Sequence, residues 1–330
     1  MLVYLVVFFT LLIVEIIYLK LAKFFNISDT PNHRSAHVTP TLRGGGIILV
    51  PAILLFLLLF PNELNDYIGF CLAVLILAII SFIDDIITLS SKIRIIIHVI
   101  SLTIVFYSLN LFQASSLFEM TLIFLAYIFS LGYLNIYNFM DGINGITFLN
   151  ALITFVTYYL INEYIIEFSS SDLLMVLIFA IVVFGIFNFR KKPKCFAGDV
   201  GSITIGFTII YFIIKLFSIT GSYAVFLMLG VYLLDGGWTI IERLVRKENI
   251  LEAHRRHLYQ LFANEIKVPH LKISLMYFLV QMFLNLIVLY LIKIGEKNYL
   301  IVVLIFMVLS IGYFFMKRNT YRKVNQINEK

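Results

Sequence analysis

The sequence is poor in charged residues and in cysteine. Only 13% of its 330 residues are charged, whereas 61% are hydrophobic, and the mean hydropathy is +0.99. A soluble globular domain carries about 25% charged residues, so the composition excludes that class. Two cysteines, Cys71 and Cys195, are too few for a disulfide framework. Low-complexity tracts and internal repeats are also missing, so we expect a single integral-membrane domain over residues 1–330.

Apolar runs recur along the whole chain instead. A helix needs about 20 mostly apolar residues to cross about 30 Å of hydrocarbon, where its backbone groups must pair within the segment. We predict an all-α, polytopic membrane helix bundle with about 11 transmembrane helices. The first run has no basic start and no small-residue cleavage site, so we interpret it as a retained helix. The predicted spans are about 2–25, 44–60, 67–83, 95–113, 117–137, 146–162, 172–188, 201–218, 222–240, 272–293 and 299–316.

Lysine and arginine are nearly missing from one set of connections between these spans. If the spans alternate in direction, all but three of the 25 basic residues fall in the other set, and the exceptions are Lys215, Lys293 and Lys297. By the positive-inside rule the basic set is cytoplasmic, the N-terminus is outside and the C-terminus is cytoplasmic. Topology and anionic headgroups then explain the net charge of +6, and no nucleic-acid partner is needed.

Aspartate gathers on the same predicted side. Ionised carboxylates in hydrocarbon cost several kcal/mol each, so the adjacent pair Asp84 and Asp85 indicates a site that attracts positive charge. Lys92 and Arg94 follow within about two helical turns and could receive a phosphate group. The aspartates at or near predicted cytoplasmic helix ends are Asp29, Asp84, Asp85, Asp141, Asp199 and Asp235.

A polar stripe is predicted in "LGYLNIYNFMDGINGI" (131–146), where Asn135, Asn138 and Asp141 follow at steps of three. Each step turns the helix back by about 60°, so the three side chains occupy an arc of about 120°. The stripe favours a binding face. The alternative is an interfacial helix end with amide caps.

The segment "RKKPKCFAGDVGSITIGF" (190–207) places Asp199 between Gly198 and Gly201 where the next span begins. A helix N-terminus can offer backbone N–H groups to an anion, and an aspartate there can hold a cation that bridges to it. Mg²⁺ takes hard oxygen ligands, usually one or two from protein and the rest from water and phosphates. Asp199 with the amide oxygen of Asn138 would suffice as metal ligands.

The longest predicted cytoplasmic loop contains "ERLVRKENILEAHRRHLYQ" (242–260), with His254, Arg255, Arg256 and His257 in a row. The two histidines could form a zinc pair, but no cysteine or third ligand is near. Phosphate or nucleotide binding by these donors is favoured over zinc. The remaining alternative is a plain solvated basic loop.

The connector "DTPNHRSAHVTPTLRGGG" (29–46) holds Asp29, His33, Arg34, His37 and Arg43. Taken alone it is a turn-rich link between two helices. Together with the other segments it is predicted to form a further wall of the same site, in which Arg34 and His37 bind substrate.

These five motifs together resemble the polyprenyl-phosphate N-acetylhexosamine-1-phosphate transferases, which form glycosyltransferase family 4. The resemblance implies that undecaprenyl phosphate attacks the β-phosphorus of a UDP-N-acetyl sugar and releases UMP. It further implies Mg²⁺, or Mn²⁺, as cofactor, with Asp199 as its ligand. The motifs that carry the resemblance are "DTPNHRSAHVTP", "FIDDIITLSSKIR", "NIYNFMDGINGI", "FAGDVGS" and "HRRHLYQ".

The resemblance also implies roles for the other polar residues. Asp84 and Asp85 match the pair near the reacting phosphates, one of which would deprotonate the lipid phosphate. Asn138 and Asp141 match the stripe beside the metal and sugar nucleotide, with Asp141 counted as catalytic. The histidine loop would cover the nucleotide. Substrate-binding residues are then Arg34, His37, Lys92, Arg94, Asn135, Asn138, His254, Arg255, Arg256 and His257.

Two departures from the family pattern bear on the sugar. Ser35 follows Arg34 where the peptidoglycan and common-antigen branches usually carry lysine, and the last motif reads "HRRHLYQ". Both favour the O-antigen branch, which transfers N-acetylated deoxyhexosamine phosphates. We therefore expect a multi-pass protein of the bacterial plasma membrane, with a cytoplasmic active site and membrane lipids around it. A homodimer is compatible with this expectation.

A secondary transporter of phosphorylated or acidic solutes is the alternative from another class. Transporters also carry intramembrane carboxylates and basic loops. They usually bind near the bilayer midplane, on broken helices of two related halves. Here the charges gather at one face and the halves show no clear similarity, which favours the transferase.

Overall fold

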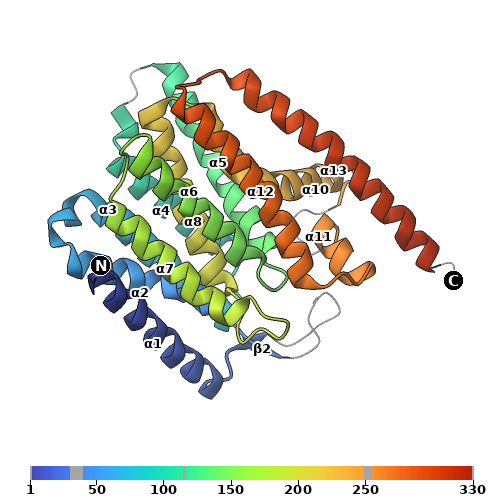
Figure 1. The fold of residues 1–330 in the computed structure, drawn as a ribbon, viewed down its shortest axis with the longest axis horizontal. Helices are drawn as coiled ribbons and strands as arrows, with labels where there is room; N and C mark the ends of the chain where they lie inside the picture. The colour runs from blue at the N-terminus through green and yellow to red at the C-terminus, as the bar shows by residue number, and fades with distance from the viewer. Residues whose placement is uncertain (1, 30–39, 114–115, 249–254, 329–330) are drawn as a thin grey trace.

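The computed structural model describes residues 2–29, 40–113, 116–248 and 255–328, and it confirms a polytopic helical membrane bundle (Figure 1). The longer helices are α1 (Leu2–Phe24), α2 (Leu49–Leu59), α3 (Leu64–Ile86), α4 (Ser91–Ser108), α5 (Leu117–Met140), α6 (Ile146–Tyr164), α7 (Ser171–Asn188), α8 (Gly198–Thr220), α10 (Trp238–Val245), α12 (His270–Lys293) and α13 (Tyr299–Asn328). Short helical pieces join some of them: Gly45–Ile48, Pro61–Glu63, Leu111–Gln113, Tyr223–Leu229, α9 (Gly230–Tyr232), Leu233–Gly237, α11 (Leu258–Gln260) and Leu261–Glu265.

Helices lie at all eleven predicted positions, but the number of candidate membrane spans is lower. Within the described residues, nine helical segments are long and apolar enough to cross a membrane. The helical segment Gly45–Leu59 is too short. Helix α6 carries the buried amides Asn150 and Asn162, which lower its hydropathy. A helix enclosed by other helices needs no continuous apolar surface, because its polar groups find partners inside the protein.

Helix α8 is the centre of the bundle. It packs against α3, α5 and α6, and nearly every side chain from Val200 to Ile213 is buried. By contrast, α1 and α13 run along opposite margins of the bundle (Figure 1) and expose large apolar side chains such as Phe9 and Phe315. In a spanning helix such side chains are expected to meet lipid. The packing of α3, α5 and α6 around α8 therefore fixes the position of residues at its N-terminus.

Small residues allow one close approach to α8. The segment Gly45–Ile48 crosses its first turn, and a Cβ atom on Gly46 would lie 2.3 Å from the Cα atom of Gly201. Only glycine permits two backbones to meet at this distance. The contact brings the residues just before Gly46 to the N-terminus of α8.

A short extended segment completes this contact. Strands β1 (Ser28–Asp29) and β2 (Thr41–Leu42) form an antiparallel pair in which Ser28 lies opposite Leu42. On its other side Leu42 bridges to Cys195, whose neighbour Phe196 donates its N–H to the Leu42 carbonyl at 2.8 Å. Backbone pairing therefore fixes the chain on both sides of Arg43.

Candidate active site

Asp85 caps the N-terminus of α8. Its Oδ1 accepts the backbone N–H of Asp199 at 2.9 Å, and its Oδ2 accepts that of Val200 at 3.0 Å. The first N–H groups of a helix have no partner inside the helix and carry partial positive charge, so a carboxylate there is stabilised. The Asp85 side chain is fully buried, and this cap joins the end of α3 to the start of α8.

Gly198 makes the cap sterically feasible. Its φ angle is +74°, and a Cβ atom at this position would lie 2.6 Å from Asp85 Oδ2 and 2.7 Å from the backbone nitrogen of Gly44. A side chain would suffer both from the left-handed backbone and from these overlaps. The glycine before Asp199 is therefore a requirement of the local geometry.

Arg43 bridges two of the aspartates. Its Nε lies 2.8 Å from Asp85 Oδ1 and its terminal Nη2 lies 3.1 Å from Asp199 Oδ1. The Arg43 carbonyl accepts the Tyr18 hydroxyl at 2.7 Å, which holds the residue's backbone in place. Burial alone would lower the pKa of Arg43, but the charges of Asp85 and Asp199 raise it above its usual value. The guanidinium therefore stays charged.

Arg94 forms the second cationic contact. Its Nη1 lies 3.2 Å from Asp84 Oδ2 and 3.9 Å from Asp199 Oδ2. The other oxygen of Asp84 accepts the backbone N–H of Leu89 at 2.6 Å, so Asp84 also closes the turn between α3 and α4. Both arginine side chains keep about a third of their surface exposed, at 34% for Arg43 and 37% for Arg94. We call Arg43, Asp84, Asp85, Arg94 and Asp199 the aspartate cluster.

The end of α5 reaches this cluster through Ser202. The Ser202 hydroxyl donates to Asn138 Oδ1 at 2.9 Å and lies 3.4 Å from the Asp199 carbonyl oxygen. Asp141, at the C-terminal end of α5, accepts the Thr147 hydroxyl. Burial raises the pKa of Asp141 to about 6, although the Thr147 hydrogen bond and the charge of Arg43 oppose the shift.

Asn135 does not join them. Its side chain is exposed, and its amide donates to the Leu131 carbonyl of its own helix at 2.8 Å. The predicted arc of about 120° explains the difference, because a residue two steps from Asp141 has rotated off the face that meets α8. Lys92 is likewise exposed, two residues before Arg94 on α4.

The sequence predicts that the histidine loop covers a nucleotide with both histidines. In the described part of this loop, residues 255–260, His257 is instead turned inward. His257 is buried beside Asp235, with its Nδ1 3.7 Å from Asp235 Oδ1, and its ring stacks on Tyr259. Asp235 accepts the backbone N–H of Leu258 at 2.8 Å and the Tyr277 hydroxyl at 2.7 Å. His257 therefore points into the protein, where it helps to position the loop.

Tyr259 attaches this loop to the rest of the site. Its hydroxyl donates to the carbonyl of Phe139 at 2.7 Å, between Asn138 and Met140 on α5. A side chain on Gly142 would overlap this hydroxyl. The loop therefore lies directly over the segment that carries Asn138 and Asp141.

The two loop arginines differ. Arg256 lies 2.6 Å from Glu248 Oε1 and 3.5 Å from Glu242 Oε1, so it ties the loop to the end of α10. Arg255 has a buried Nε with no hydrogen-bond partner among the described residues, and this donor is the better candidate for a substrate phosphate. The predicted residues Arg34, His37 and His254, together with Ser35, lie outside the described residues.

The oxygen atoms around Asp199 are few for a divalent cation but meet the needs of Mg²⁺. Within the described parts of the chain, no group of three or more His, Cys, Asp or Glu side chains could hold a metal. Mg²⁺ requires fewer, because water and phosphates supply most of its ligands. Asp199 is the most accessible of the three cluster carboxylates, at 17% exposure, and Ser202 connects it to the Asn138 amide oxygen. Asp199 and Asn138 fit such a cation.

Part of the chain is similar to a known protein family. Residues 67–217 match the family model described as glycosyl transferase family 4. The matched residues include the aspartates of the cluster, Arg94 and Asn138, whereas Arg43 and the histidine loop lie outside them. The resemblance to this family that the sequence predicts is confirmed over residues 67–217.

The chain also resembles curated proteins over part of its length. It is 28% identical over 200 residues to the phospho-N-acetylmuramoyl-pentapeptide-transferase of Streptococcus sanguinis (strain SK36). It is 29% identical over 197 residues to the protein of the same name from Streptococcus pneumoniae serotype 19F (strain G54). Each match covers 54% of this chain and 60% of the relative. The chain thus spans about 60% of the length of the curated relatives it matches.

Sequence reasoning missed three contributors to the geometry. Arg43 was placed in the wall of the site but was not named as a binding residue, although it contacts two aspartates. Ser202 was not singled out, and Asp235 was named without the partners that give it a role. A basic residue directly before three glycines was the one local signal for Arg43, since glycine allows close backbone approach.

We predict that Asp85→Asn destabilises the protein. An amide presents one acceptor where two backbone N–H groups and Arg43 now have a carboxylate, and an unsatisfied buried donor costs about 1–3 kcal/mol. Thermal unfolding in detergent should show a lower midpoint for Asp85→Asn. Glu163→Gln, which changes an exposed carboxylate near the C-terminal end of α6, is the control and should leave the midpoint unchanged. Equal midpoints for the two variants would contradict the capping role.

We also predict that stability depends on the ionisation of Asp141. Its raised pKa means that the folded state holds the proton more tightly than the unfolded state, so stability falls as the pH rises from about 4 to about 6. Asp141→Asn cannot ionise and escapes this loss. Its unfolding midpoint should exceed that of the wild type at pH 8 and approach it at pH 4. The exposed Glu163→Gln variant should show no such trend, and an equal trend in both would refute the assignment.

Proposed function

We propose that the protein transfers a sugar 1-phosphate from a UDP-sugar to undecaprenyl phosphate, releases UMP and thereby starts the assembly of a lipid-linked surface polysaccharide. The observation that supports it most is the aspartate cluster, where three carboxylates and two guanidinium groups meet at the N-terminus of α8. Arginine is well suited to bind phosphate, and the N-terminus of a helix favours anions. The site thus has groups for two phosphorylated substrates.

The reaction is a phosphoryl transfer. An oxygen of the lipid phosphate forms a bond to the β-phosphorus of the donor while the bond from that phosphorus to the bridging oxygen breaks. The bonding electrons leave with UMP. Such reactions depend mainly on positioning and on stabilisation of phosphate charge. A divalent cation held by Asp199 and Asn138 would supply part of that stabilisation.

The side chains of the aspartate cluster would position the substrates and stabilise their phosphate charge. Asp85 fixes Asp199 through the backbone of α8, and Arg43 and Arg94 can exchange their carboxylate partners for phosphate oxygens. The second ionisation of a phosphate monoester occurs near pH 6, so the lipid phosphate is already largely dianionic at pH 7. A strong general base is then unnecessary, and Asp84 and Asp85 serve mainly to place the arginines.

Two finer parts of the proposal come from the sequence. Because of Ser35 and the motif "HRRHLYQ", we propose an N-acetylated 6-deoxyhexosamine as the sugar, as in O-antigen synthesis. The site would face the cytoplasm, on the side of the bacterial plasma membrane to which the basic loops belong. The relatives are named as transferases of phospho-N-acetylmuramoyl-pentapeptide, so the donor must be tested directly.

The test is UMP release by the purified protein with undecaprenyl phosphate, Mg²⁺ and a panel of UDP-N-acetyl sugars. We expect turnover that stops with EDTA, returns with Mg²⁺ or Mn²⁺, and is lost in Asp199→Asn although that variant folds. The control Glu163→Gln, at an exposed position on α6, should keep its activity. Activity that survives chelation would remove the metal from the proposal, and no UMP with any donor would refute the transferase.

Donor choice is decided by kcat/KM in competition. A pocket that accommodates a methyl group rarely rejects a hydroxylated analogue by more than about 10²-fold, so some turnover of UDP-N-acetylglucosamine is expected. Preference for UDP-N-acetylmuramoyl pentapeptide over the deoxy sugars would overturn the sugar assignment and leave the reaction class intact.

A further inference from the structure

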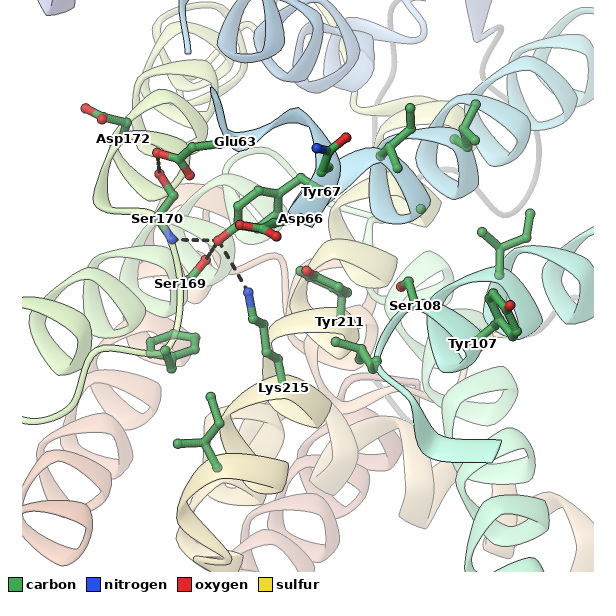
Figure 2. A pocket seen from close by; sticks show the side chains of 18 of the residues that line it. Glu63, Asp66, Tyr67, Tyr107, Ser108, Ser169, Ser170, Asp172, Tyr211 and Lys215 are labelled. Atoms are coloured by element: carbon green, nitrogen blue, oxygen red, sulfur yellow. Dashed lines mark hydrogen bonds between the residues drawn. The ribbon is translucent and has the colours of Figure 1, made fainter. Parts of the chain in front are cut away.

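A second polar cavity lies at the other end of the bundle. Its volume is about 950 Å³, and it is bounded by the first turns of α3, the end of α4, the segment before α7 and the end of α8 (Figure 2). Lys215 lies 16 residues after Asp199 on α8, which at 1.5 Å per residue is about 24 Å away along the helix. The cavity is therefore separate from the aspartate cluster.

Lys215 points into this cavity toward Tyr67. Its Nζ donates to the Tyr67 hydroxyl at 3.3 Å and lies 4.6 Å from the centre of the Tyr67 ring and 5.9 Å from that of Tyr211 (Figure 2). The Tyr67 hydroxyl also contacts Ser169 Oγ at 2.9 Å and accepts the backbone N–H of Ser170 at 2.6 Å. Its hydrogen-bonding capacity is therefore used within the protein.

The ammonium group of Lys215 has N–H donors that no described residue accepts. It carries three N–H donors, of which one has a partner among the described residues. No described carboxylate lies within 4.0 Å of it, and Asp66 and Glu63 act on it only through longer-range attraction. A partly buried cation without a close counter-ion is costly, so an anionic group is the complementary ligand.

The other residues that line the cavity further restrict the charge and polarity of the ligand. Four carboxylates border the cavity, and the side chains of Asp66 and Glu167 are exposed at its rim. A purely anionic ligand would be repelled by them, whereas a ligand with a phosphate and an ammonium group satisfies both signs. The exposed apolar residues Ile68, Leu72 and Ile219 also line the cavity. These belong to spanning segments, so an acyl chain could lie against them.

The depth of the lysine agrees with a lipid headgroup. Lys215 precedes the end of α8 at Thr220 by five residues, or about 7.5 Å. Each headgroup region is about 5–8 Å thick, so the lysine lies near the boundary between headgroups and hydrocarbon. A lysine near a helix end usually extends to water, but this one turns to two aromatic rings.

We propose that this cavity binds a zwitterionic phospholipid with a primary amine, of the phosphoethanolamine type. The phosphodiester contacts Lys215, the ammonium group contacts the rim carboxylates Asp66 and Glu167, and the acyl chains follow Leu72 and Ile219. The site would anchor the junction of α3 and α8 to the membrane leaflet opposite the aspartate cluster.

Native mass spectrometry of the purified protein tests the proposal. The protein is incubated with phosphatidylethanolamine, phosphatidylglycerol and phosphatidylcholine of equal chain length, and the bound lipid is measured for wild type, Lys215→Met and Lys215→Arg. The control is Lys293→Met, which removes an exposed lysine at the same end of the bundle. We expect phosphatidylethanolamine to bind most tightly, with about tenfold weaker binding in Lys215→Met and near-normal binding in Lys215→Arg and the control.

Several outcomes would overturn the proposal. Equal retention of phosphatidylethanolamine by wild type and Lys215→Met would exclude the lysine as its ligand. Tighter binding of phosphatidylglycerol would exclude the zwitterion, and displacement of lipid by millimolar inorganic phosphate would indicate a soluble anion. If Lys215→Met does not fold, Asp66→Asn serves instead. It should reduce the preference for phosphatidylethanolamine over phosphatidylcholine, and an unchanged preference would refute the rim contact.

Discussion

The capping of α8 by Asp85 is the interaction on which the site depends. One buried carboxylate binds two backbone N–H groups of α8 and the guanidinium of Arg43, and so joins α3, α8 and the segment after β2. A buried charge is tolerated only when such partners surround it. The same contacts determine where Asp199 and Arg43 lie, so the structural anchor and the groups proposed to bind phosphate are one assembly.

The two ends of α8 carry opposite chemical features. The N-terminus offers positive partial charge, which the Asp85 carboxylate complements, and the C-terminal half offers Lys215 against tyrosine rings. Because α8 is enclosed by other helices as far as Ile213, the groups at its N-terminus cannot extend sideways into lipid, whereas its last turns are partly exposed. This arrangement supports a reaction site at one end and a lipid contact at the other, on one rigid helix.

Much of the fold follows from hydropathy, because spanning helices must be long and apolar. The aspartates were also predicted to converge, and Asp84, Asp85 and Asp199 do. The three-residue spacing correctly predicts that Asn138 faces α8. It also places Asn135 on that face, but each step of three residues rotates the side chain by about 60°, and Asn135 points away from α8.

The features of the site that the sequence does not predict depend on contacts between segments distant in the chain. Nothing in the loop sequence indicates that His257 turns inward to Asp235, because that contact depends on residues more than twenty positions away. Arg43 reaches Asp85 only because β2 pairs with the segment before α8 and Gly46 packs on Gly201. The unpaired Lys215 could be located in the sequence as an isolated basic residue, but its cavity could not, since that is formed by four separate helices.

A double-mutant cycle between Arg43 and Asp85 tests the central claim most directly. The measured quantity is kcat/KM for UMP release by wild type, Arg43→Gln, Asp85→Asn and the double variant. If the two residues act as one unit, the double variant should lose little more than the worse single variant, with a coupling of at least about 1.4 kcal/mol, or tenfold. Losses that simply multiply, as expected for Arg43→Gln combined with the exposed Glu163→Gln on α6, would contradict the account.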